Sequence, residues 1–166
     1  MTDSSPRLFP DDAAIVHIGE GLLARTLPRE EWTHEAHLAA SLWIARERPE
    51  IAPVQDLAAI ISAYNESVGG VNDDTQGYHD SITRIYIEAV RVHLSRRDTG
   101  EPLVQSVNAL LASPLGRRDL PLRFYSPELL FSVPARHKFV DPDLLPLSAM
   151  VESVQVSPIS VTLRLP

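Results

Sequence analysis

The chain has 166 residues, with 15 Lys+Arg against 22 Asp+Glu, a formal net charge of −7 and no cysteine. This length suits one domain, and 44% hydrophobic residues is ordinary for a folded globular protein. The lack of cysteine excludes disulfides, zinc fingers, iron–sulfur clusters and catalytic thiols. The acidic balance argues against general nucleic-acid binding. Because no apolar run approaches the ~20 residues of a membrane span, and residues 1–12 lack a signal-peptide pattern, we expect a cytoplasmic protein without a membrane partner.

Five helices are predicted, each from capping residues and apolar residues at helical spacing. They run from Asp11–Asp12 to about Thr26, from Thr33 to about Arg48, from Pro53 to Gly69, from the 71–76 loop to about Arg96, and over about Leu103–Ala112. The second is apolar around most of its circumference, which indicates a central position. The sequence therefore predicts a mainly α fold, a single-domain helical bundle.

The two ends of the chain have a different character. Residues 1–10 are predicted to form a flexible lead-in, residues 11–147 the helical domain, and residues 148–166 an extended tail. Prolines divide the chain after Pro114 into short pieces that we expect to wrap the bundle irregularly, and Ser126-Pro127-Glu128 has the pattern of a short capped helix. Alternating apolar residues from Val151 to Leu165 suggest a short C-terminal strand, interrupted by Pro158.

The strongest chemical pattern is Trp32-Thr33-His34-Glu35-Ala36-His37. On a helix, His34 and His37 share one face at about 5–6 Å between Cβ atoms, within reach of a common metal ion. That face is otherwise apolar, so both imidazoles point inward and need partners. Two core histidines that bind backbone or carboxylate groups are the alternative explanation.

His79 is the third candidate, in Gly77-Tyr78-His79-Asp80 near the start of the fourth helix. A helix N-terminus disfavours imidazolium, so all three histidines should be neutral near pH 7, the form that binds a metal or acts as a base. Three histidines with an open position are typical of a metal that activates water, and zinc, iron, manganese or nickel would fit. Nearby carboxylates would supply a fourth ligand or orient the imidazoles; they are Glu31, Glu35, Asp73, Asp74 and Asp80.

A second pattern is basic. The segment 116–138 carries a local charge of +3 in an acidic chain, from Arg117, Arg118, Arg123, Arg136 and Lys138 against Asp119 and Glu128. Arg123 with Tyr125 could clamp a carboxylate or phosphate over the histidine pocket, while Tyr78 and Asn65 could line it. A solvated basic edge is the alternative.

Three segments together resemble an uncharacterised family of small bacterial proteins. They are Trp32-Thr33-His34-x-x-His37-Leu38, Gly77-Tyr78-His79-x-x-x-Thr83, and Arg123-Phe124-Tyr125-Ser126-x-Glu128-x-Leu130-Phe131-Ser132. The resemblance covers about Pro28–Leu147. It implies that the three segments belong together, and it implies no reaction.

Three functional hypotheses follow. The first is a metal-dependent hydrolase, lyase or oxygenase for a small polar or anionic organic molecule, with His34, His37 and His79 as metal ligands and Glu35 orienting them. The second is a metal-free enzyme with His79 or His34 as base and Thr83 as orienter. The third is a non-catalytic helical ligand-binding or interaction module with core histidines. No nucleotide or flavin signature is present, and a homodimer is left open.

Overall fold

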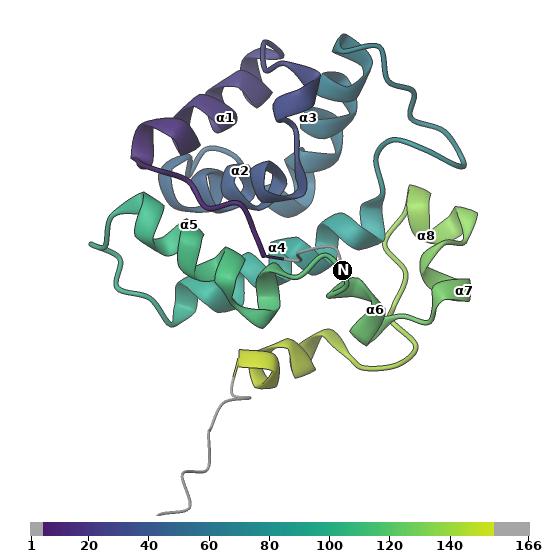
Figure 1. Ribbon diagram of the computed structural model, residues 1–166. Coiled ribbons are helices and arrows are strands. Elements are labelled where there is room, and N and C mark those ends of the chain that lie inside the picture. The colour runs from purple at the N-terminus through teal and green to yellow at the C-terminus, as the bar shows by residue number, and fades with distance from the viewer. Residues whose placement is uncertain (1–4, 155–166) are drawn as a thin grey trace, which may run out of the picture.

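The computed structural model describes residues 5–154, and throughout this range the regular elements are helices, as predicted (Figure 1). The longer ones, α1 to α5, span Asp12–Ala24, His34–Glu47, Pro53–Ser67, Asp80–Ser95 and Leu103–Ala112. The short helices α6, α7 and α8 span Pro121–Phe124, Pro127–Leu130 and Val133–His137. Three 3-10 turns complete the order, η1 over Arg29–Glu31, η2 over Pro114–Gly116 and η3 over Leu147–Val154.

The predicted capping residues begin these helices. The Asp11 side chain accepts a hydrogen bond from the Ala14 N–H at 2.9 Å, and the Thr33 hydroxyl accepts one from the Ala36 N–H at 3.2 Å. Pro53 occupies the first turn of α3, where its missing N–H costs nothing. The predicted helix starts are thus confirmed at these positions.

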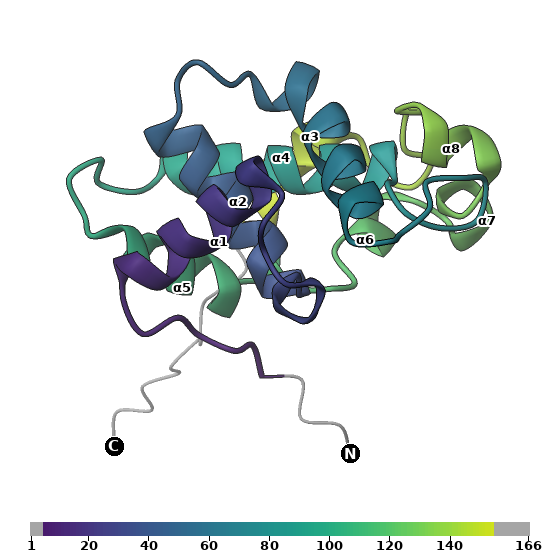
Figure 2. The same cartoon turned by 90° about the horizontal axis from the view of Figure 1, so that it is seen from above.

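Helix α2 is the centre of the bundle and contacts α1, α3, α4 and α5 (Figures 1 and 2). Its Leu38, Leu42 and Ile44 side chains are almost completely buried. Helix α1 lies very close to it, because Gly19 has no side chain and the Trp43 ring fills that space. The helix predicted to be central is therefore the one around which the others pack.

In the C-terminal wrap, α6 to α8, the last two helices lie at the end of the molecule opposite to α1 and α5 (Figures 1 and 2). Each helix begins with a proline in its first turn, and Ser126 and Ser132 cap α7 and α8. The predicted Ser126-Pro127-Glu128 helix is α7. The chain just after the wrap is bonded to the start of α4, where the Phe139 N–H donates to Asp80 at 2.7 Å.

Two segments predicted as flexible or extended are ordered where the structure describes them. Residues 5–10, here called the N-terminal strap, are bonded to α5, because the Asn108 side chain accepts from the Phe9 N–H and donates to the Phe9 carbonyl, both at 2.9 Å. Residues 147–154 form η3 instead of extended chain, and its Met150 is buried against the core. The remaining tail and its alternating pattern lie outside the described residues. Among the described helices, none is long and apolar enough to cross a membrane.

Candidate functional site: a cavity at the start of α2

The three predicted histidines occupy different environments. The His34 Nε2–H donates to the Gly116 carbonyl at 2.8 Å, and the ring packs edge-on against Tyr86, with 5.4 Å between ring centroids. Tyr86 is seven residues after His79, about 10 Å further along the axis of α4. The start of α2 therefore meets the middle of α4, whereas His79 lies at the N-terminal end of α4.

His79 caps α4. Its Nδ1 accepts a hydrogen bond from the Ile82 N–H at 3.2 Å, and its Nε2–H donates to the Leu130 carbonyl at 2.8 Å. Burial, reinforced by the nearby Arg136, holds the pKa of His79 below its usual range. The predicted orienter Thr83 donates to the backbone carbonyl of His79 and not to its ring. Both ring nitrogens are occupied, so His79 and Thr83 hold the helix start together and neither is arranged as a ligand or base.

His37 is also engaged locally. Its Nδ1–H donates to the Thr33 carbonyl at 2.7 Å, and its ring stacks on Trp32 at 3.8 Å between centroids. Burial lowers the pKa of His37 to about 4, so the imidazole is neutral at pH 7. Within residues 5–154, no group of three or more histidine, aspartate or glutamate side chains is placed to hold a metal ion. The described residues do not fit the predicted three-histidine centre, and metal binding stays a prediction.

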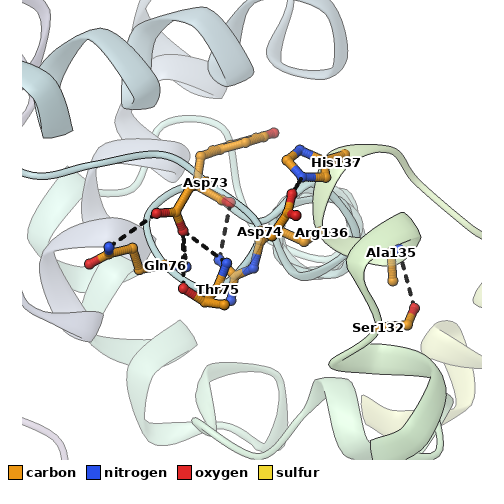
Figure 3. A network of polar contacts seen from close by, with 9 residues as sticks. Asp73, Asp74, Thr75, Gln76, Ser132, Ala135, Arg136 and His137 are labelled. Atoms are coloured by element: carbon orange, nitrogen blue, oxygen red, sulfur yellow. Dashed lines mark hydrogen bonds and ion pairs between the residues drawn. The ribbon is translucent and has the colours of Figure 1, made fainter.

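Two further residues were predicted to line the pocket, Asn65 and Tyr78. Both belong instead to a hydrogen-bond network around the 71–79 loop. Asn65 donates to the Asn72 side chain, and the Tyr78 hydroxyl donates to Asp80 at 2.8 Å. Figure 3 shows the tip of this loop. Asp73 accepts bonds from Thr75 and Gln76, and Asp74 bonds to His137 of α8 at 2.6 Å. These contacts attach the loop to the C-terminal wrap.

The predicted anion clamp is not formed. Tyr125 is fully buried, and its hydroxyl donates to the Val140 carbonyl at 2.6 Å. Arg123 is exposed, two residues earlier on the outside of α6. The buried and the exposed side chain point apart because the short helix places one inward and the other outward.

A cavity of about 730 Å³ opens at the start of α2. Its wall is built by the N-terminal strap, the first turn of α2, the end of α5 and the loop after η2. The lining residues are Ser5, Pro6, Arg7, His34, Glu35, Leu111, Ala112, Ser113, Pro114, Gly116, Arg117, Arg118 and Asp119. Of the predicted site residues, His34 and Glu35 are brought together here. The volume is within the range of small-molecule sites, about 300–1,000 Å³.

The cavity is rich in charge. Arg7, Arg117 and Arg118 face two carboxylates, Glu35 and Asp119. Arg117 donates to Asp119 from Nε and Nη2, at 2.8 and 2.9 Å, so the charges of this pair largely neutralise each other. Glu35 is different, because its side chain is only 9% exposed while its partner Arg118 is 71% exposed and lies 3.5 Å away. The balance of the lining is one positive charge when His34 is neutral.

His34 is a neutral base in this wall. Burial lowers its pKa below the usual range and Arg118 adds to the effect, although the bond to Gly116 opposes it. Since the Gly116 carbonyl can only accept, the proton of the neutral ring is on Nε2 and Nδ1 carries a lone pair. Among the described residues, no donor is bonded to that Nδ1. His34 therefore offers the cavity a hydrogen-bond acceptor and a group able to take a proton.

Sequence reasoning missed Arg7. Within the +3 segment it predicted Arg123 as the anion contact, whereas Arg117 and Arg118 are the members of that segment that line the cavity. Arg7 lies in a stretch of Ser and Pro that is typical of a flexible end. Its backbone N–H lies 3.5 Å from the Glu35 carboxylate. The one local signal for this contact was that Glu35 is an acidic residue in the first turn of a helix, where a carboxylate is stabilised.

Family models, curated proteins and solved structures were compared with the chain, and none matches. The resemblance to a bacterial family stays a prediction. Of its three segments, the second and third meet where His79 bonds to Leu130, whereas the His34 imidazole bonds to the loop after α5. The functional assignment consequently depends on the cavity.

Proposed function

We propose that this protein binds a small organic acid in the cavity at the start of α2. The observation that carries the proposal is the composition of one wall, where the neutral His34 and the arginines Arg7 and Arg118 face a space of about 730 Å³. Guanidinium groups recognise carboxylates through two parallel N–H donors. Leu111, Ala112 and Pro114 offer apolar surface for the rest of the molecule. This is the predicted substrate class, a small polar or anionic molecule, at a site shifted from Arg123 to Arg118.

The test is a calorimetric titration of the protein with sodium isovalerate at low ionic strength. A charge-assisted hydrogen bond contributes about 1.5–3 kcal/mol, so Arg118→Gln should weaken binding roughly tenfold or more. Arg123→Gln is the matched control, because it removes the same charge from an exposed position outside the cavity. Equal effects of the two variants, or no binding by the wild type, would contradict the proposal.

A second candidate function is catalytic, and the lone pair on His34 Nδ1 favours it. A neutral imidazole beside a bound acid can remove a proton from the carbon next to the carboxylate, and Arg118 would stabilise the charge that develops. Hydrogen–deuterium exchange at that carbon in D₂O, followed by NMR, tests this function. The exchange should stop in His34→Gln while isovalerate still binds.

A further inference from the structure

The carboxylate of Glu35 has weak partners for so buried a charge. Its side chain is 9% exposed, and the two bonds that it makes to other residues within 5–154, from the Arg7 N–H and from Arg118 Nη2, are both 3.5 Å long. Charge-assisted bonds to carboxylates are usually about 2.7–2.9 Å long. The amide of Glu35 at the helix start also favours the charged form, and the pKa of this carboxyl is lowered in spite of burial. An ionised acid in the cavity wall thus has capacity for stronger donors.

The two opposite charges of the wall are adjacent. Arg118 Nη2 and Glu35 Oε2 are separated by 3.5 Å, so a molecule that touches both must carry its own opposite charges close together. In an α-amino acid, the ammonium and carboxylate groups are attached to one carbon atom. Its ammonium group would donate to Glu35, and its carboxylate would accept from Arg118. A simple acid, by contrast, would bind Arg118 while facing the negative charge of Glu35.

The remaining lining indicates the kind of side chain. Leu111, Ala112 and Pro114 form the apolar part of the wall, at the end of α5 and the start of η2. A branched aliphatic group of three or four carbons would bury its surface there. We propose that the ligand of this cavity is a zwitterionic α-amino acid with a small apolar side chain, held between Glu35 and Arg118. This inference depends on the proposed function, since Arg118 binds the carboxylate in both.

The experiment compares L-valine with its two halves. Isovalerate is valine without the ammonium group, and isobutylamine is valine without the carboxylate. Calorimetric titrations of the full chain at pH 7 should show valine binding at least tenfold more tightly than either half. Equal affinities for valine and isovalerate would overturn this inference and leave the proposed function intact, whereas no binding of any of the three would overturn both.

A charge-neutral variant assigns the effect to Glu35. Glu35→Gln keeps the shape, and we expect it to weaken valine binding at least tenfold while isovalerate binds as well as before or better. Glu31→Gln is the matched control, because Glu31 pairs with His17 outside the cavity. Unchanged valine binding in Glu35→Gln would overturn the inference. The wild-type comparison of valine with isovalerate decides the question even if Glu35→Gln folds poorly.

Discussion

Four of the six histidines donate a ring N–H to a backbone carbonyl, at Gly116, Thr33, Leu130 and Ser106. In each of them burial lowers the pKa, and the bond to the carbonyl only partly opposes it. His93 belongs to this group. It lies in the last turn of α4, a position that suggests an exposed basic residue, but its side chain is buried. At the residue scale the imidazoles are therefore neutral structural donors, and His34 is the one that also lines the cavity.

Acid should destabilise the protein through His37. The pKa of this imidazole is about 4 in the folded state, against 6.5 for a free histidine, so the unfolded chain binds more protons between these values. The contribution of the neutral His37 to the free energy of unfolding is complete above pH 6.5 and declines as the pH falls towards 4. Its total is about 3 kcal/mol, because each pKa unit corresponds to about 1.4 kcal/mol. Urea unfolding at pH 7, 6, 5 and 4.5 should show this decline, and a smaller one in His37→Gln; parallel curves for the two proteins would refute the assignment.

At the element scale, helix starts were predictable because their signals are local. Asp11 and Thr33 each accept a bond from the amide three residues later, and Pro53 itself occupies the first turn of α3. The partners of the histidines were not predictable, because His34 binds a carbonyl 82 residues away and His79 one 51 residues away. Histidine spacing within one helix cannot reveal which distant carbonyl satisfies each ring. The cavity was missed for the same reason, since its walls come from three stretches separated in the sequence, residues 5–7, 34–35 and 111–119.

The contact between α1 and α2 predicts that replacing a helical glycine by alanine destabilises the protein, which is the opposite of the usual effect. An alanine in place of an unhindered helical glycine stabilises by about 1 kcal/mol. At Gly19, however, an added Cβ would lie 2.1 Å from Trp43 Cε3, and the Trp43 ring is itself buried. Gly19→Ala should therefore lower the free energy of unfolding by about 1–3 kcal/mol in urea titrations.

The control for Gly19 is Gly100→Ala. A Cβ there would meet nothing nearer than Asp98 Oδ1 at 3.4 Å. Its effect should stay within about 0.5 kcal/mol. A stabilising Gly19→Ala would mean that α1 and α2 can move apart without loss.

At the scale of the whole molecule, the end that holds α7 and α8 is a separate region from the end that holds α1 and α5 (Figures 1 and 2). The wrap is attached to the 71–79 loop by Arg136, whose Nη1 donates to the carbonyls of Gly77 and Tyr78 at 3.2 and 3.3 Å. The Asp74–His137 pair lies beside it (Figure 3). By contrast, α1 and α5 lie at the opposite end (Figures 1 and 2). Local opening of one region should therefore leave the other region closed.

Hydrogen exchange with mass spectrometry tests this separation. Removing the Arg136 bonds should cost about 1 kcal/mol, so Arg136→Ala should raise exchange about fivefold in the 71–79 loop and in α8. Exchange in α1 and α5 should not change. Lys138→Ala removes the same charge two residues away and serves as the control. A uniform increase across the chain would show that the molecule opens as one unit.

The bond pair between Asn108 and Phe9 has a consequence for which substitutions the chain tolerates. The side-chain amide gives Phe9 both an acceptor and a donor, each at 2.9 Å. An aspartate would set a second acceptor against the Phe9 carbonyl, a serine is too short to reach both groups, and a glutamine is one methylene too long. Half-buried positions on an outer helix usually accept many residue types. Position 108 instead demands one amide of one length. Its mutational tolerance should therefore be as narrow as that of a core position, although the feature it holds in place is the N-terminal strap, residues 5–10, which has no regular structure.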